Sequence, residues 1–275
     1  MINNLKIFNV TNRVDPLLNE LYCQPAGVGK DKFPDNYLEC KSGDNIFHKD
    51  PHYAEYVFHY WFWKNQLKNY DKNSWIGFCQ YRRYWLKEDY DKNITINRKN
   101  LKDNVLNAIP LSWKNYDAVI AKKIYVDNPK FMKIVKRGFR NFIKDPSILF
   151  NNQKQTVKLH FDMFHGYGML DKAIDLMNNN DRDNFREYVN KSRSFNPHHM
   201  FITHPKIMNE WFKSVFEWLF RCEEKFGFNS LSGYETRLYG YLAERYLSYW
   251  FNKYTNPIEW EWAFVDMNNG KRTDV

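Results

Sequence analysis

The sequence predicts an α/β fold, with a mixed β-sheet and an appended helix-rich region toward the C-terminus. Two patterns support this prediction. Up to about residue 125, short apolar runs that suit buried strands alternate with a segment of helical spacing. In the second half, longer segments carry apolar residues at intervals of three and four, as helices on a core do. Aromatic residues make up 19% of the chain, which favours a large core and argues against disorder.

Three strands and one long helix are expected in the first part. The strands cover residues 5–10, 75–79 and 116–121. Asp50-Pro51 suits a helix start, with Asp as the N-cap and Pro in the first turn, and the apolar spacing predicts that this helix ends near Tyr70. Residues 13–50 are rich in Pro and Gly and are expected to form loops.

The second half is expected to be helical. The predicted helices cover residues 170–177, 207–226 and 234–251, with Gly227 as the C-cap of the second. No linker-like composition divides the chain, so we expect one unit over residues 1–275. Within it, about 1–125 would form the α/β part and about 126–275 the helix-rich part.

Charge and cysteine content narrow the classes of function. The formal net charge of +9 favours anionic partners such as nucleic acid, acidic lipid or a diphosphate, and the densest basic cluster is residues 133–144. The four cysteines form no CxxC pair, which argues against a zinc knuckle and fits a reducing compartment. The chain begins with no signal-peptide pattern and holds no apolar run of bilayer length. We therefore expect a cytoplasmic protein, soluble or on the membrane surface.

Two adjacent arginines follow the second predicted strand. Arg82 and Arg83 follow an apolar run that ends in Cys79, with Gln80 and Tyr81 between. Guanidinium groups fit phosphate oxygens in a bidentate manner, so the pair suits a diphosphate. The alternative is that one arginine pairs with a core carboxylate, Glu55 or Glu244, while the other faces water.

Three other segments carry candidate ligand-binding groups. Gly43-Asp44-Asn45 offers acceptors for ribose or sugar hydroxyls, or forms an ordinary turn. The last helix carries a polar stripe that suits either a substrate wall or a buried ion pair: Tyr234, Arg237, Tyr241, Glu244 and Ser248. His160 and His165 have a spacing that does not suit a zinc site, so a proton-transfer role for one histidine or for Asp162 is favoured.

Six segments, taken together and in order, resemble one bacterial family. They are residues 43–46 (GDNI), 60–65 (YWFWKN), 80–85 (QYRRYW), 116–120 (YDAVI), 199–202 (HMFI) and 237–245 (RLYGYLAER). The family has long been described only as a domain of unknown function, occurs in capsule, O-antigen and exopolysaccharide gene clusters, and is grouped with the GT-A glycosyltransferases. This chain departs from the family pattern at Gln80 and His199, where His and Asn are usual.

The resemblance implies a GT-A-like, Rossmann-like fold and a glycosyltransferase that moves a sugar from a nucleotide donor, expected to be UDP-linked, to a glycan or lipid-linked acceptor. The first part would bind the nucleotide and the second the acceptor. The expected donor-binding residues are Thr11, Asp44, Asn45, Tyr81, Arg82 and Arg83. The expected acceptor-binding residues are His199, Arg237 and Tyr241. If the reaction inverts the anomeric centre, the candidate bases are Asp162, His165, Glu235 and Glu244.

GT-A enzymes typically hold a divalent metal with an Asp-x-Asp after a central strand, where this chain has Gln80-Tyr81-Arg82. We therefore assign no metal ligands and expect the arginines to replace some or all of the metal's charge, although a need for manganese or magnesium is left open. Two other functions fit the residues. One is transfer of a phosphate-containing group to a capsular sugar, and the other is non-catalytic glycan or RNA binding. Association with a membrane surface is also compatible, whereas nucleic acid is not an expected partner of the transferase.

Overall fold

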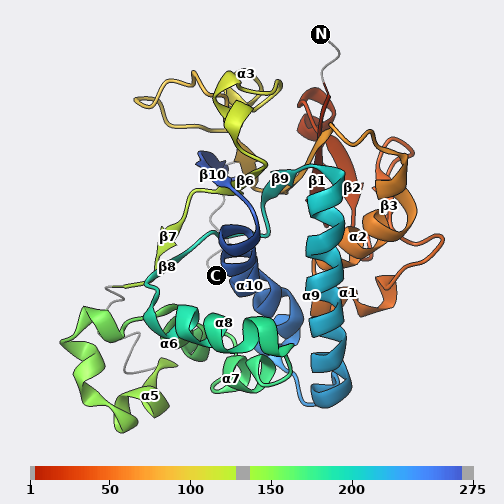
Figure 1. Ribbon diagram of the computed structural model, residues 1–275. Coiled ribbons are helices and arrows are strands. Elements are labelled where there is room, and N and C mark those ends of the chain that lie inside the picture. The colour runs from red at the N-terminus through yellow and green to blue at the C-terminus, as the bar shows by residue number, and fades with distance from the viewer. Residues whose placement is uncertain (1–3, 128–136, 268–275) are drawn as a thin grey trace.

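The computed structural model describes residues 4–127 and 137–267 and contains a mixed β-sheet flanked by helices (Figure 1). The strands of the main sheet are ordered β10-β6-β9-β4-β1-β2-β3, and β5 joins β4 to β11 at one end. Their bounds are β1 Leu5–Thr11, β2 Gln24–Gly27, β3 Leu38–Glu39, β4 Trp75–Gln80, β5 Arg83–Trp85, β6 Ala118–Ala121, β9 Phe201–Thr203, β10 Pro257–Trp260 and β11 Trp262–Phe264. A separate ribbon pairs β7 (Ile124–Tyr125) with β8 (Ser194–Phe195).

One antiparallel strand divides the sheet into two parallel parts. β1 pairs in parallel with β2 and β4, and β10 pairs in parallel with β6. β9 lies between β4 and β6 and is antiparallel to both. The carboxyl ends of β1, β2 and β4 therefore meet the start of β9 at one edge, which is where ligands commonly bind α/β sheets.

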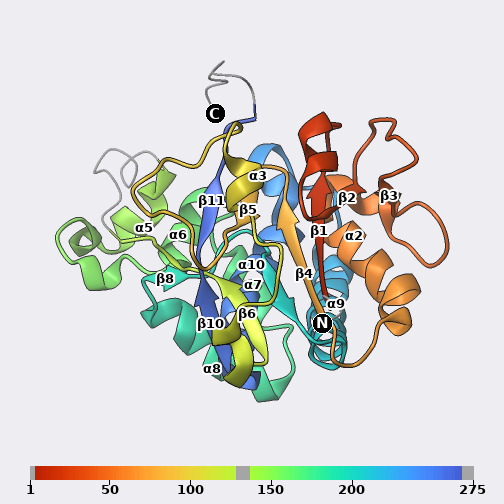
Figure 2. The same cartoon turned by 90° about the horizontal axis from the view of Figure 1, so that it is seen from above.

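The strands alternate their side chains between two cores. Phe8, Val10 and Phe78 face the larger core, whereas Leu5 and Ile7 face the smaller one. The larger core is covered by α2, α9 and α10, while α3 packs on the other face (Figures 1 and 2). Gly77 in β4 has no room for a side chain, because an added Cβ would lie 2.3 Å from Ile202 Cγ1.

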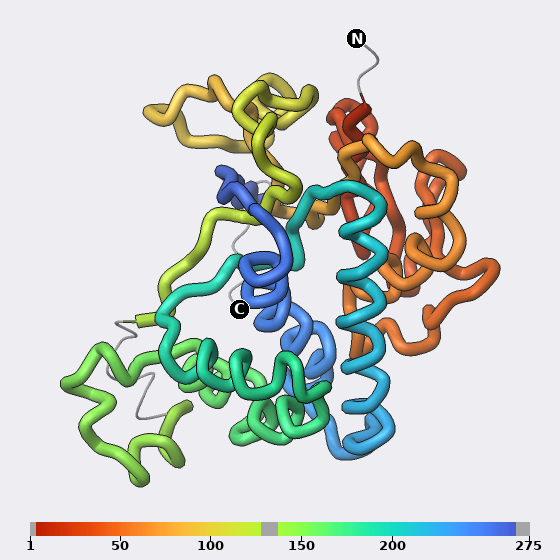
Figure 3. The backbone as a smooth tube through the Cα atoms, viewed as in Figure 1, coloured from red at the N-terminus to blue at the C-terminus, as the bar shows by residue number. Residues whose placement is uncertain are grey.

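The helices are concentrated in the second half, as expected. Their bounds are α1 Asp50–Tyr53, α2 Tyr56–Trp61, α3 Leu101–Asn104, α5 Phe139–Lys144, α6 Val157–Phe164, α7 Met169–Ile174, α8 Asn179–Lys191, α9 Pro205–Phe226 and α10 Leu238–Tyr254. Gly227 ends α9 at φ 60°, and the chain then turns through the 3-10 helix Gly233–Arg237 into α10, which packs beside α9 (Figure 3). Within the described ranges, no helix is long and apolar enough to cross a bilayer.

The prediction of an α/β fold with a helix-rich C-terminal region is confirmed, with three differences in detail. The helix predicted from Asp50 to Tyr70 is interrupted at Ala54, whose φ is 50°. β2 lies inside the segment expected to be loops. β9, β10 and β11 show that the sheet also draws on the second half, so residue 125 does not bound it.

Candidate functional site

A pocket of about 420 Å³ opens at the carboxyl ends of β1, β2 and β4, and we call it the strand-end pocket. Its walls come from the segment after β1, the loop after β2, the start of α1, the β4–β5 turn and the segment before α10. The lining residues are Val10, Asn12, Val28, Gly29, Lys30, Asp31, Asp50, Pro51, Ala54, Glu55, Gln80, Tyr81, Arg82, Arg83 and Arg237. Sequence segments far apart thus converge at the edge that the sheet topology favours for ligands.

The charged lining contains more cationic than anionic side chains, and three of the cations are guanidinium groups. Lys30, Arg82, Arg83 and Arg237 bring four cationic side chains to the pocket, and three carboxylates accompany them. Burial lowers the pKa of Arg83, although this group stays cationic at neutral pH. A pocket with several arginines and an excess of positive charge suits a multiply charged anion such as a diphosphate.

Arg83 is oriented by its own hairpin. Tyr81 and Arg82 form the two-residue turn that joins β4 to β5, and Gln80 pairs with Arg83 across it. Nη1 of Arg83 donates a hydrogen bond of 3.2 Å to Oε1 of Gln80. Gln80 is itself fixed, because Nδ2 of Asn9 donates to the carbonyl oxygen of Gln80 at 3.0 Å. Gln80, the residue that departs from the family pattern, therefore orients the guanidinium of Arg83 through this hydrogen bond.

Glu55 is a lining carboxylate that the sequence analysis did not assign to catalysis. Its Oε2 lies 3.5 Å from Nδ1 of His199, whose Nε2 donates a hydrogen bond of 3.0 Å to the carbonyl oxygen of Gly240 in α10. Burial acts to raise the pKa of Glu55, but His199, with a smaller contribution from Arg237, outweighs it and holds the pKa at about 2. Glu55 is therefore an ionised carboxylate at the pocket wall at neutral pH.

Glu244 lies behind this wall and is held on both oxygens. Oε1 accepts a hydrogen bond of 2.7 Å from the backbone N–H of His198, and Oε2 is paired with the guanidinium of Arg245. Burial opposes ionisation, but Arg245 and the two histidines before β9 place the pKa of Glu244 well below its usual range. Because its oxygens are already engaged, Glu244 is better placed to support the site than to accept a substrate proton.

Asp162 does not face the strand-end pocket. Its side chain is 1% exposed, and its oxygens accept hydrogen bonds from Lys158 Nζ, Asn141 Nδ2 and the backbone N–H of Gly168 at 2.9–3.0 Å. These contacts join α6 to its neighbouring segments. Asp162 thus holds α6 in place in the described fold, and it lines neither of the two pockets at this edge of the sheet.

A second pocket, which we call the adjoining pocket, borders the first. It has a volume of about 520 Å³ and is lined by Pro51, Gly233, Tyr234, Thr236, Arg237 and Tyr241. It shares Pro51 and Arg237 with the strand-end pocket. The ring of His165 stacks on Tyr241 at a centroid distance of 3.7 Å, and burial lowers the pKa of His165 to about 2. Glu235 is exposed in the 3-10 helix that forms this wall.

Three expected donor ligands lie outside the lining of the strand-end pocket. Thr11 is buried, and its hydroxyl donates a 2.7 Å hydrogen bond to the carbonyl oxygen of Arg13, while Asn12 lines the pocket instead. The side chain of Asn65 accepts from Asp44 N–H and donates to Asp44 C=O. Oδ1 of Asn45 accepts from the backbone N–H at 47. The turn thus uses the backbone of Asp44 and the side chain of Asn45 to fold, which agrees with an ordinary turn at Gly43-Asp44-Asn45.

The loop after β2 is a site element that the sequence analysis did not single out. Gly29 adopts a φ of 87°, a conformation that glycine takes readily, and lies beside Asn12 and Asp50. Lys30 follows it and lines the pocket. The signal available in the sequence is Gly27-Val28-Gly29-Lys30, two glycines and a lysine that suit a close approach to an anion.

The residues present do not suit a divalent metal at this edge. No carboxylate pair follows β4, where Gln80 to Arg83 stand. Among residues 4–127 and 137–267, no group of three or more His, Cys, Asp or Glu side chains is arranged to hold a metal ion. Arg82 and Arg83 would also repel a cation placed between them.

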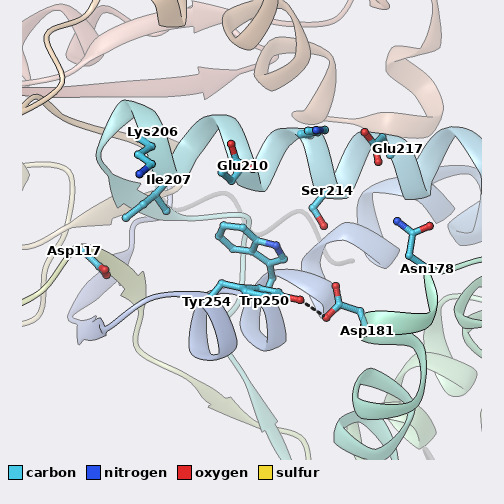
Figure 4. A pocket seen from close by; sticks show the side chains of 11 residues that line it. Asp117, Asn178, Asp181, Lys206, Ile207, Glu210, Ser214, Glu217, Trp250 and Tyr254 are labelled. Carbon is cyan, nitrogen blue, oxygen red and sulfur yellow. Dashed lines mark hydrogen bonds between the residues drawn. The ribbon is translucent and has the colours of Figure 1, made fainter.

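A larger pocket of about 660 Å³ lies at the other end of the parallel strands, near Asp117 before β6 and between α9 and α10 (Figure 4). Its central carboxylate, Asp181, already accepts hydrogen bonds of 2.8–3.0 Å from Tyr246, Tyr249, Tyr254 and Lys253. It contains lysines but no arginine. This pocket is therefore not the candidate site for a phosphate-bearing ligand.

The fold defined by this sheet is one found in a known glycosyltransferase structure. The chain aligns with the apo structure of WbbM, described as a bifunctional glycosyltransferase, with a TM-score of 0.62 and 20% identity. The alignment covers 95% of this chain but 45% of that protein, so this chain spans less than half of its length. A comparison with curated proteins gave no match. The model of the family described as domain of unknown function DUF4422 matches residues 6–256, and the chain belongs to that family.

Proposed function

We propose that this protein is a glycosyltransferase that moves a sugar from a nucleotide diphosphate donor, a UDP-linked sugar first among the candidates, to a glycan or lipid-linked acceptor of a surface polysaccharide. The observation that carries the proposal is the convergence of Lys30, Arg82, Arg83 and Arg237 at the carboxyl ends of parallel strands. The shared fold with a described glycosyltransferase supports it. The four free cysteines fit action in the reducing cytoplasm.

The donor would lie in the strand-end pocket with its diphosphate against the arginines. Arg83 is half-buried and hydrogen-bonded to Gln80, so its guanidinium group is oriented before the ligand binds. Such preorganised charge costs little reorganisation when the sugar leaves and negative charge grows on the diphosphate. Asn12 and Tyr81 would contact the nucleoside, in place of Thr11, whose hydroxyl is already engaged.

The acceptor would occupy the adjoining pocket. Tyr234 and Tyr241 supply aromatic walls, and Arg237 borders both pockets. Aromatic faces suit the apolar faces of sugar rings. The shared wall would bring an acceptor hydroxyl next to the anomeric carbon of the donor. Arg237 thereby combines the expected role in acceptor binding with a contact to the donor side.

The transfer step forms one bond and breaks another. The acceptor hydroxyl oxygen attacks the anomeric carbon, and the bond from that carbon to the β-phosphate oxygen breaks, so the nucleoside diphosphate leaves with the electron pair. In an inverting reaction the hydroxyl proton passes to a base, and Glu55 is the carboxylate that lines the pocket in an ionised form. In a retaining reaction the leaving phosphate can take the proton, and Glu55 would stabilise positive charge at the anomeric carbon.

The arginines would also supply charge that a divalent metal supplies elsewhere. By the family resemblance, Gln80-Tyr81-Arg82 stands where an Asp-x-Asp would hold the ion, and Arg83 follows it. On this basis we expect full activity in excess chelator. A strict need for manganese, together with activity that Arg82→Ala leaves unchanged, would contradict this part of the proposal.

A donor hydrolysis assay tests the proposal. Purified protein would be given a panel of nucleotide sugars with different bases and sugars, and release of the nucleoside diphosphate would be measured with and without oligosaccharide acceptors. Release from one or a few donors, stimulated by an acceptor, is expected. No release from any donor would contradict the proposal. Release of a nucleoside monophosphate, with phosphate retained on the acceptor, would instead indicate transfer of a phosphate-containing group.

A further inference from the structure

The segment around α5 has two opposite faces. The inward face is held by Phe142, which packs on the small apolar cluster of Ile148, Leu159 and Met163. Asn141 fixes the same side by donating a hydrogen bond to Asp162. The outward face carries Phe139 and Ile143, which lie one helical turn apart.

The outward face is apolar and open. Phe139 is 54% exposed, Ile143 is 62% exposed and Phe150, just after the following 3-10 helix, is 86% exposed. Three large apolar side chains within residues 139–150 seldom stay this exposed on a soluble surface without a partner. In Figures 1 and 2 this segment lies at the periphery, away from the sheet.

Basic side chains border this apolar face on one side, where the cationic groups of Arg140 and Lys144 lie 5.5 and 5.2 Å from the ring centroid of Tyr167. Arg140 and Lys144 are exposed on α5, beside Phe139 and Ile143. Residues 137–154 contain four basic residues and one acidic residue, Asp145, which already forms an ion pair with Lys154. Exposed aromatic and aliphatic groups flanked by arginine and lysine are the pattern of a surface that inserts at a lipid interface and is drawn to anionic headgroups.

The same segment lies next to the adjoining pocket. The guanidinium of Arg137 sits 5.8 Å from the ring centroid of Tyr234, which lines that pocket, and 4.9 Å from that of Phe164 in α6. A membrane against α5 would therefore be close to the place where the acceptor is proposed to bind.

We infer that the face formed by Phe139, Arg140, Ile143, Lys144 and Phe150 docks this protein on an anionic lipid surface. Phe139, Ile143 and Phe150 enter the headgroup region, and Arg140 and Lys144 contact lipid phosphates. The link from this face to a lipid-linked acceptor rests on the proposed function. Docking itself does not, because it depends only on the exposed groups of this segment.

Vesicle co-sedimentation of the full chain tests this inference. The probes are vesicles of phosphatidylcholine with and without phosphatidylglycerol, at low and at high salt. Wild type should bind the anionic vesicles, and high salt should weaken binding, since each basic group near such a surface raises partitioning about fivefold at low ionic strength. F139S/I143S and R140E/K144E should each lower binding by at least about tenfold.

Matched controls come from another surface of the chain. Leu111 is 91% exposed and Lys114 is exposed in the 3-10 helix Leu111–Asn115, so L111S and K114E make the same kinds of substitution, one residue at a time, elsewhere. Both controls should bind like wild type, and all variants should keep the melting temperature and the donor hydrolysis rate. Vesicle binding is measured without substrates, so a negative transferase assay would not change its interpretation. A negative vesicle assay would likewise leave the proposed transferase activity untouched.

Three outcomes would overturn the inference. The first is absence of wild-type binding to anionic vesicles. The second is an equal loss of binding in the control variants. The third is a wild-type dimer in sedimentation velocity that F139S/I143S converts to monomer without any vesicle binding, since that would make the face a contact between two copies of this chain.

Discussion

Arg83 Nη1 donates a hydrogen bond of 3.2 Å to Gln80 Oε1 across the two-residue turn that ends β4. This contact joins the last residue of a buried parallel strand to the cation that we place against the donor diphosphate. It also explains why a polar side chain is tolerated at position 80, where 8% of the residue is exposed. A hydrogen bond to a charged group is worth about 1.5–3 kcal/mol, so it can restrict the position of the guanidinium.

Gln80→Ala should weaken nucleotide diphosphate binding about tenfold. Without the hydrogen bond to Gln80 Oε1, the Arg83 side chain is no longer held in one orientation. Ordering this side chain on binding then weakens the net binding free energy. The affinity can be measured by titration calorimetry. Gln153→Ala, at an exposed position, is the matched control and should bind like wild type. An unchanged affinity in Gln80→Ala would show that this hydrogen bond does not prepare the site.

Glu55→Gln should lower the transfer rate by about a hundredfold or more while nucleotide affinity stays the same or rises. The change removes a proton acceptor, whose contribution is typically about 10²–10⁴, and it also removes a negative charge from an anion pocket. Rate and affinity should be measured on the same preparation. A fall in affinity with an unchanged maximal rate would assign Glu55 to donor binding instead.

Stability should fall as the solution is acidified below about pH 6.5, in part through His59. Burial lowers the pKa of His59 to about 3 from an ordinary value of 6.5. Below pH 6.5, His59 is therefore protonated in the unfolded chain but stays neutral in the folded chain. At pH 5 this difference lowers the free energy of unfolding by about 2 kcal/mol. His59→Phe should reduce the loss between pH 7 and pH 5 by about that amount in urea denaturation.

Wild type and His59→Phe should be compared by how their free energies of unfolding change with pH, because the substitution also alters packing against Phe78. At pH 8 the histidine is neutral in both states, so any difference there reports packing and the loss of the buried ring nitrogens rather than protonation. His165 and His198 have pKa values lowered in the same direction and should leave a residual acid sensitivity. Parallel stability curves for wild type and His59→Phe from pH 8 to pH 5 would contradict this account.

The Gly43-Asp44-Asn45 turn gives a test between binding and structure. Gly43→Ala should destabilise the fold by about 1–3 kcal/mol, because φ is 64° and the new Cβ would lie 2.3 Å from Asn65 Oδ1. Asp44→Ala should change nucleotide affinity less than about threefold, since Asp44 is absent from the pocket lining. A large loss of affinity in Asp44→Ala, with the melting temperature unchanged, would restore the expected role in donor binding.

Apolar runs and helical spacing in the sequence predicted several strands and helices correctly. The apolar runs gave β1, β4 and β6, and the helical spacing gave α9 and α10. β2 was missed, because Gln24-Pro25-Ala26-Gly27 is short and contains two residues typical of turns. The three-residue strand β9 was missed as well, since its position depends on antiparallel pairing to β4 and β6, which no local pattern records.

Only part of the candidate site was predictable from the sequence. Arg82 and Arg83 stood out because two adjacent guanidinium groups come shortly after an apolar run, and both line the strand-end pocket. Glu55 carried no comparable signal, because it lies at the start of a helix and acquires its partner, His199, from a segment 144 residues later. The contact of Gln80 with Arg83 likewise required the turn geometry.

Calorimetric titration of UDP into the protein in excess chelator tests the central claim most directly, since that claim is that the arginines at the end of β4 bind the donor diphosphate. Wild type should bind, and Arg82→Ala and Arg83→Ala should each bind at least about tenfold more weakly. Arg186→Ala on α8, which removes an ion pair with Asp175 at the end of α7, should bind like wild type. If UDP is the wrong nucleotide, the same titration with GDP, ADP and TDP should identify the one that binds. Absence of binding by every nucleotide diphosphate, or equal binding by wild type and both β4 variants, would contradict the account.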